Sequence, residues 1–258
     1  MFKEAITSER LREQLRRRAN ARLLESRLQV NAALGSNEHP TMVSSEWYRR
    51  RTWSAADRAD FEMRLKRSRT AYRRAQYLRL QAFHLQEVGT PELHFAALQL
   101  LERVITEYGS ETSQLAQAHE QRGQSLAALG RHQEALDAYR AALDAERIYP
   151  NWQTEAYLGF AELVVSLRRA ELYEEVLASL AAHRPSELFP IQQFRSASAR
   201  AAIHAARSER DLAGEAAVAA LAAAEKTESP FRYHRNLGLV PGPAIEVKAW
   251  LEHLARGG

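Results

Sequence analysis

The chain has 258 residues, of which 45% are hydrophobic and 26% are charged, and its formal net charge is +4. These values are typical of a globular protein with one large domain or two small ones. The absence of cysteine excludes disulfides, thiolate metal sites and cysteine nucleophiles. Only 11 Gly and 8 Pro occur, which argues against an all-β fold with many tight turns.

The amino-terminal sequence MFKEAITSERLREQLRRR has no apolar stretch of the kind found in secretory signals. The longest charge-free apolar run of the Ala-rich region, Ala216–Ala224, is much shorter than the roughly 20 residues of a membrane-spanning helix. Arginine far outnumbers lysine, as is typical of GC-rich bacterial genomes. We therefore expect a cytoplasmic bacterial protein that does not bind membranes.

Positive charge is concentrated at the start of the chain. Residues 1–80 hold 19 Lys and Arg against 9 Asp and Glu, whereas residues 81–258 carry a net charge of −6. A basic region can attract an anionic partner. The same composition also fits solvated helix surfaces joined by internal ion pairs.

Apolar residues recur with helical spacing along the chain, and no segment shows strand-like alternation. The first predicted helix covers residues 5–34, and a linker follows at 35–45. Ser54, with Asp57 three residues later, predicts the N-cap of a helix that continues to about Arg69. Further helices are predicted at 71–88, from Pro91 to the stop at Gly109, and at 113–129, 133–147, 153–168, 170–183, 191–208, 211–226 and 244–255.

The predicted fold class is therefore all-α. We expect three parts, which are a basic N-terminal helix with its linker (1–45), a helical core (46–185), and C-terminal capping helices with an irregular tail (186–258).

Residues 116–150 carry a pattern of small and aromatic residues across two predicted helices. Gly123 lies in the first helix and Ala135 in the second, and Tyr139 and Pro150 follow. Small residues at Gly123 and Ala135 would allow two antiparallel helices to pack closely beside the ring of Tyr139. The pattern resembles the tetratricopeptide repeat, although His119 stands where that family places Trp.

Weaker copies of the pattern flank this repeat. Ala97 repeats the role of Ala135 at a step of 38 residues, with Ala82 as its small partner, and Gly159 follows Gly123 by 36 residues. The resemblance covers about residues 72–183. It implies antiparallel helical hairpins stacked as a short right-handed superhelix, an α-solenoid.

The resemblance also implies a concave groove, lined by the first helix of each hairpin, that holds a peptide or a partner helix. The residues expected to face this groove are Gln76, Arg79, Phe83, Gln86, Glu120, Gln124, Gln153, Ala156 and Phe160. This set lacks the Lys/Asn/Arg cluster with which some family members bind a C-terminal carboxylate.

Signals for catalysis are absent from the known motifs, which include the phosphate loop, the dinucleotide fingerprint and the zinc-protease pattern. We expect no catalytic residue, no metal site and no cofactor. The sequence WYRRRTW at 47–53 instead suggests anion binding by Arg49, Arg50 and Arg51. The basic stretch continues through Arg64, Lys66, Arg67, Arg69, Arg73 and Arg74.

The sequence thus favours a protein-binding scaffold or adaptor that is not an enzyme. The alternative is a nucleic-acid-binding protein that uses the Arg-rich first 80 residues.

Overall fold

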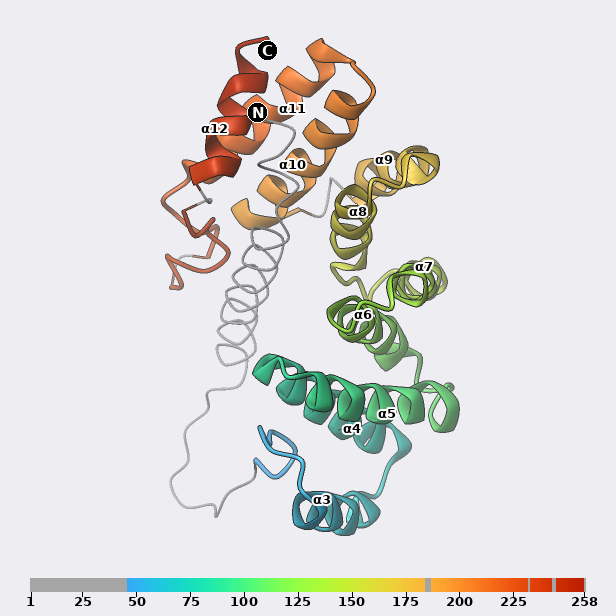
Figure 1. Cartoon of the computed structure of the whole chain (residues 1–258). Coiled ribbons are helices and arrows are strands. Elements are labelled where there is room, and N and C mark those ends of the chain that lie inside the picture. Colours follow the sequence, from blue (N-terminus) through green and yellow to red (C-terminus); the bar gives the residue numbers. More distant parts are fainter. Residues whose placement is uncertain (1–45, 184–186, 232, 243–244, 258) are drawn as a thin grey trace. The chain divides into compact units, whose positions relative to one another are not determined.

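The computed structural model describes residues 46–183, 187–231, 233–242 and 245–257. These residues form α-helices and no β-strand, which confirms the all-α fold class (Figure 1). The predicted helix at 5–34 and the linker at 35–45 lie outside the described residues. The helices are α3 (Ala55–Arg67), α4 (Ala71–Val88), α5 (Pro91–Glu107), α6 (Thr112–Ala128), α7 (His132–Ile148), α8 (Ala156–Leu167), α9 (Tyr173–His183), α10 (Pro190–Ala206), α11 (Arg210–Ala224) and α12 (Ile245–Ala255), with a single 3₁₀ turn at Ala170–Leu172.

The described chain divides into two compact units, one ending at Leu163 and the other beginning at Val164. The boundary falls inside α8. The first unit contains α3 to α7, and the second contains α9 to α12. The three-part division drawn from the sequence stays a prediction.

Local sequence signals place several helix ends where they were expected. The hydroxyl of Ser54 accepts the backbone N–H of Asp57, and the Asp57 carboxylate accepts the N–H of Ser54, so the predicted capping box is confirmed. Gly89 ends α4 with a φ of +79°, a conformation that favours glycine. Thr90 then caps α5, whose first residue is Pro91.

The core of the first unit begins with an aromatic cluster between α3 and α4. Phe61 of α3 is fully buried, and the indole of Trp47 lies 5.2 Å from its ring and 4.9 Å from the ring of Tyr77. Aliphatic residues of α4 and α5 continue this core, among them Leu78, Leu85 and Leu101. Rings of this size contribute much of the apolar area that stabilises a helical layer.

Helices α6 and α7 pack against each other and are joined by a turn in which Gly130 has a φ of +77°. The ring of Tyr139 on α7 contacts two glycines. A β-carbon at Gly123 of α6 would lie 2.8 Å from ring carbons of Tyr139, and a β-carbon at Gly159 of α8 would lie at the same distance. The close helix contact predicted for Gly123 is therefore present, and Gly159 meets the same ring.

The second unit has an alanine-rich core. Helices α10, α11 and α12 pack through small side chains such as Ala201, Ala217 and Ala220, with Leu251 of α12 fully buried among them. The tail before α12 packs on the start of α10, because Ile191 N–H donates to the carbonyl of Gly238 over 2.8 Å. No helix among the described residues has both the length and the apolar character needed to cross a membrane.

Candidate functional site

Four of the side chains expected to face a partner groove are buried. Phe160 is fully buried, and Phe83, Gln86 and Glu120 are each less than 9% exposed. Gln86 is part of the internal packing between α4 and α6, where its Nε2 donates to the carbonyl of Gln121 and to Ser125 Oγ. Ala156 is fully buried as well.

The other groove candidates keep exposed surface. Arg79 of α4 donates from Nε to Gln114 Oε1 of α6 over 2.8 Å, and Gln124 donates from Nε2 to Glu120 Oε1 over 3.2 Å. Gln76 is half-buried on α4. Gln153 was expected in a helix, but it lies in the exposed turn before α8, which begins at Ala156. The polar face of α4 and α6 is therefore the part of the predicted groove that a partner can touch.

The anion site predicted at Arg49, Arg50 and Arg51 is engaged in internal ion pairs. Arg50 binds Asp57 and Asp60 of α3 and donates from Nε to the carbonyl of Trp47. Its backbone N–H donates to Gln81 Oε1, and Gln81 Nε2 donates to the carbonyl of Arg50, so this residue fastens the segment before α3 to α4. Arg49 pairs with Glu46, and Arg51 lies 3.6 Å from Glu87.

These pairs leave a different set of arginines uncompensated. All four acidic residues between 46 and 80 are in ion pairs: Glu46 with Arg49, Asp57 with Arg50, Asp60 with Arg50 and Arg64, and Glu62 with Arg103. By contrast, the exposed guanidinium groups of Arg67, Arg69 and Arg73 have no ion pair with any described residue. The sequence placed these arginines in the basic stretch but could not show that their neighbours were already neutralised.

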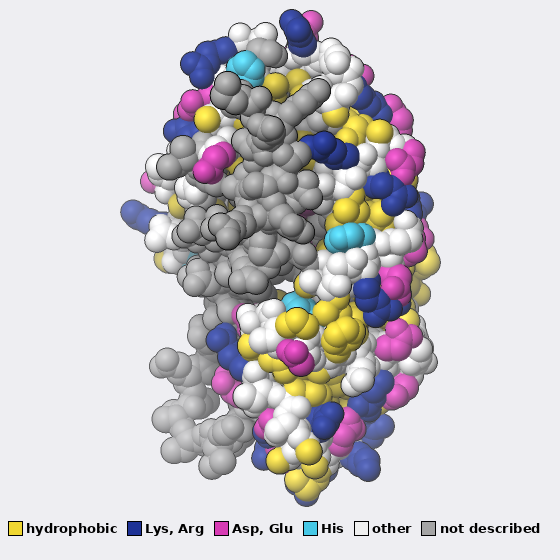
Figure 2. All heavy atoms as spheres, viewed as in Figure 1, with side chains coloured by type: hydrophobic (Ala, Val, Ile, Leu, Met, Phe, Trp, Pro, Cys, Tyr) yellow, Lys and Arg dark blue, Asp and Glu magenta, His cyan; other side chains and the backbone are white. Residues whose placement is uncertain are grey.

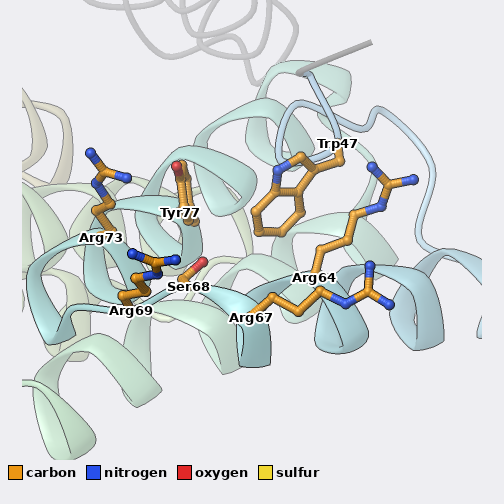
Figure 3. A pocket seen from close by; sticks show the side chains of 7 residues that line it. All are labelled: Trp47, Arg64, Arg67, Ser68, Arg69, Arg73 and Tyr77. Carbon is orange, nitrogen blue, oxygen red and sulfur yellow. The ribbon is translucent and has the colours of Figure 1, made fainter. Parts of the chain in front are cut away.

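The three arginines surround a depression at the corner between α3 and α4, which we call the arginine corner. Its volume is about 410 Å³, and it is lined by Trp47, Arg64, Arg67, Ser68, Arg69, Arg73 and Tyr77. Figure 3 shows Arg69 and Arg73 on one side of Tyr77, and Arg64 and Arg67 on the side of Trp47.

The turn that carries the corner is held by backbone contacts. Arg74 donates from Nε to the carbonyl of Ser68 over 2.9 Å, and the N–H of Ser68 donates to the carbonyl of Leu65. Thr70 caps α4 by accepting the N–H of Arg73. The first turn of α4 contains no acidic residue, so the partial positive charge at this helix end adds to that of the arginines.

Two histidines in the first unit have perturbed titration. Burial lowers the pKa of His84, and its hydrogen bond of 2.7 Å from Nδ1 to the Glu87 carboxylate partly opposes this effect. Burial also lowers the pKa of His119, and the positive charge of Arg122 acts in the same direction. Among residues that the structure describes, no three His, Asp or Glu side chains gather in a way that could hold a metal ion.

A second exposed feature is the turn between α7 and α8, which carries Ile148, Tyr149 and Trp152 with exposed fractions of 68%, 38% and 43%. The turn is held by Glu146, a buried carboxylate of α7 that accepts the backbone N–H of Thr154 over 2.9 Å as well as its hydroxyl. The chain thus presents these apolar side chains on a braced turn.

Charged side chains of both signs are interspersed over the described surface seen in Figure 2. Comparison of the chain with protein-family models, with curated proteins and with solved structures gave no significant match in any of the three. The candidate sites are therefore judged on their geometry and chemistry alone.

Proposed function

We propose that this chain is a protein-binding scaffold or adaptor, built from tetratricopeptide-like helical hairpins that form a short superhelix, and that it is not an enzyme. The observation that carries the proposal is the contact of one ring, Tyr139, with both Gly123 and Gly159. In the repeat pattern these glycines hold equivalent positions in successive hairpins. A shared ring between them is the contact that stacked repeats require, because each repeat buries its apolar face against the next.

The hairpin α4–α5 supports the same proposal. Ala82 and Ala97, which the pattern assigns to the close approach of this hairpin, are both fully buried in one core cluster. In stacked hairpins of this kind the first helix lines the inner face. That face would be formed by α4 and α6, where polar groups such as Arg79 and Gln124 keep exposed surface.

The nucleic-acid alternative is weaker. Three of the arginines on which it rests, Arg49, Arg50 and Arg51, are engaged with carboxylates of the same unit. A guanidinium that already binds a carboxylate has little net charge to offer a phosphate.

Capture of protein partners from cell extract tests the proposal, with and without nuclease and with two matched variants. Gln124→Lys changes the predicted inner face on α6, where the side chain already bonds Glu120 four residues earlier. Gln133→Lys makes the same change on α7, where the side chain bonds Asp137 four residues later. We expect one stoichiometric, nuclease-resistant partner that is lost with Gln124→Lys and kept with Gln133→Lys. Retention in both variants would argue against this face, and loss of all captured protein with nuclease would favour the nucleic-acid alternative.

A further inference from the structure

The arginine corner has a local excess of positive charge that the fold does not use. Its uncompensated guanidinium groups come from the end of α3, the connecting turn and the first turn of α4, at Arg67, Arg69 and Arg73. Placing like charges together is unfavourable by itself, and Arg73 stands at the positive end of a helix, where a cation is disfavoured. An anionic ligand would relieve both effects.

The dimensions of the corner favour a ligand with several anionic groups. A volume of about 410 Å³ falls within the range of roughly 300–1,000 Å³ that is usual for binding sites. The depression is open to solvent, and arginines stand on both sides of the aromatic pair Trp47 and Tyr77 (Figure 3). A single small anion would reach only one side. A chain segment crossing the depression could reach both.

The aromatic residues distinguish a polypeptide from a nucleic acid. Strands of nucleic acid bind through basic grooves in which bases stack on free aromatic faces. Here the indole of Trp47 packs against Tyr48, Phe61 and Tyr77 at centroid distances of 5.5, 5.2 and 4.9 Å. Tyr77 is in turn tilted against Tyr48 at 4.7 Å. Because these rings already pack on one another, they offer an apolar floor to the depression and little free surface for stacking.

We propose that the arginine corner binds an acidic segment of a protein partner, with carboxylates of Asp or Glu side chains held by Arg67, Arg69 and Arg73. The guanidinium group is planar and donates two parallel hydrogen bonds to a carboxylate, which suits this ligand chemistry. Ser68 and Tyr77 provide further hydroxyl groups at the edge of the same depression. The inference rests on the proposed function, since its ligand is a protein, and it adds the chemical character of that partner.

The test measures binding of a fluorescently labelled peptide of about six glutamates, which spans about 20 Å when extended, to the full chain by fluorescence anisotropy. The variant replaces the three arginines together, as Arg67→Gln, Arg69→Gln and Arg73→Gln. A matched control removes the same charge from three exposed arginines elsewhere, as Arg147→Gln, Arg235→Gln and Arg256→Gln. Circular dichroism establishes that both variants retain the helical content of the unmodified chain.

We expect the corner variant to bind the peptide about tenfold or more weakly and the control variant to bind within about twofold of the unmodified chain. Binding should also weaken as salt rises from about 50 to about 300 mM, because the corner is exposed. Equal weakening in both variants, or no binding at low salt, would overturn the proposal. So would an unlabelled single-stranded oligonucleotide of equal charge that competes for the same arginines more strongly than the peptide does.

Failure here is separable from failure of the proposed function. A partner captured from extract that is lost with Gln124→Lys but retained with the corner variant would support the scaffold and refute the acidic segment. A partner lost with the corner variant and retained with the control variant would support both.

Discussion

The ring of Tyr139 lies so close to Gly159 that a β-carbon on the glycine would sit 2.8 Å from the ring carbons Cε1 and Cζ. Real β-carbons do not approach other atoms this closely. The contact joins α7 to α8, and the ring makes the same demand on Gly123 of α6. One side chain therefore sets the approach of three helices.

Gly159→Ala should destabilise the protein because the new methyl group overlaps a buried ring. We expect a loss of about 1–3 kcal/mol in the free energy of unfolding, which is usual for an overpacked core. Chemical denaturation followed by circular dichroism measures it. Combining Gly159→Ala with Tyr139→Leu should recover part of the loss beyond simple addition, since the shorter side chain vacates the space. Strict additivity of the two changes would show that the helices adjust without strain.

Arg50→Ala and Arg49→Ala form a matched pair in neighbouring positions. Arg50 bonds two carboxylates of α3 and a backbone carbonyl, whereas Arg49 forms one exposed pair with Glu46. We expect Arg50→Ala to lower the free energy of unfolding by roughly 1–3 kcal/mol, because its buried partners lose charged hydrogen bonds. The expected change for Arg49→Ala is below about 0.5 kcal/mol. Equal effects in thermal denaturation would mean that Arg50 does not fasten the segment before α3.

Stability should fall on acidification through the range in which histidine titrates. The pKa of His119 is lowered from 6.5 in the folded chain, so the unfolded chain binds the proton more readily. The stability that the neutral imidazole allows is therefore fully present above about pH 6.5 and is lost as pH falls towards the folded pKa. His84 acts in the same direction.

His119→Leu tests this dependence. The slope of unfolding free energy against pH between about 5 and 7 should become smaller, because one proton-binding difference is removed. The remaining slope should include the part that His84 contributes. An unchanged slope would show that His119 titrates normally in the folded chain.

Glu146→Ala should loosen the turn between α7 and α8. The backbone N–H of Thr154 would lose its carboxylate acceptor, which is a loss of about 1–3 kcal/mol for a buried group. Faster amide exchange at residues 151–154 and a changed fluorescence of Trp152 are the expected readouts. Asp144→Ala serves as the control, because Asp144 forms only an exposed pair with Arg147. A similar response of the turn in both variants would contradict the bracing role of Glu146.

Much of the helical architecture could be read from local signals. Ser54 with Asp57, and Thr90 with Pro91, mark helix starts through bonds made within one turn, so the residues that specify the start are adjacent in sequence. The pairing of Gly123 with Tyr139 could also be predicted, because both lie in one hairpin at a fixed spacing. The end of one predicted helix was wrong: Gln153 precedes α8, since Thr154 bonds Glu146 and forms a turn.

The binding residues depended on tertiary contacts instead. Helical spacing placed Phe83, Gln86, Glu120 and Phe160 on one exposed face, yet all four are buried, because spacing defines a face but not what covers it.

Charge shows the division most clearly. The sequence by itself determined that the first 80 residues are basic and that the chain is helical, because composition and periodicity are properties of the chain order. Only the tertiary structure decided which arginines remain available. Asp57 and Asp60 neutralise Arg50, while Arg67, Arg69 and Arg73 meet no carboxylate among the described residues. The physical reason is that an ion pair forms only within a few ångströms, a distance that folding sets and sequence separation does not.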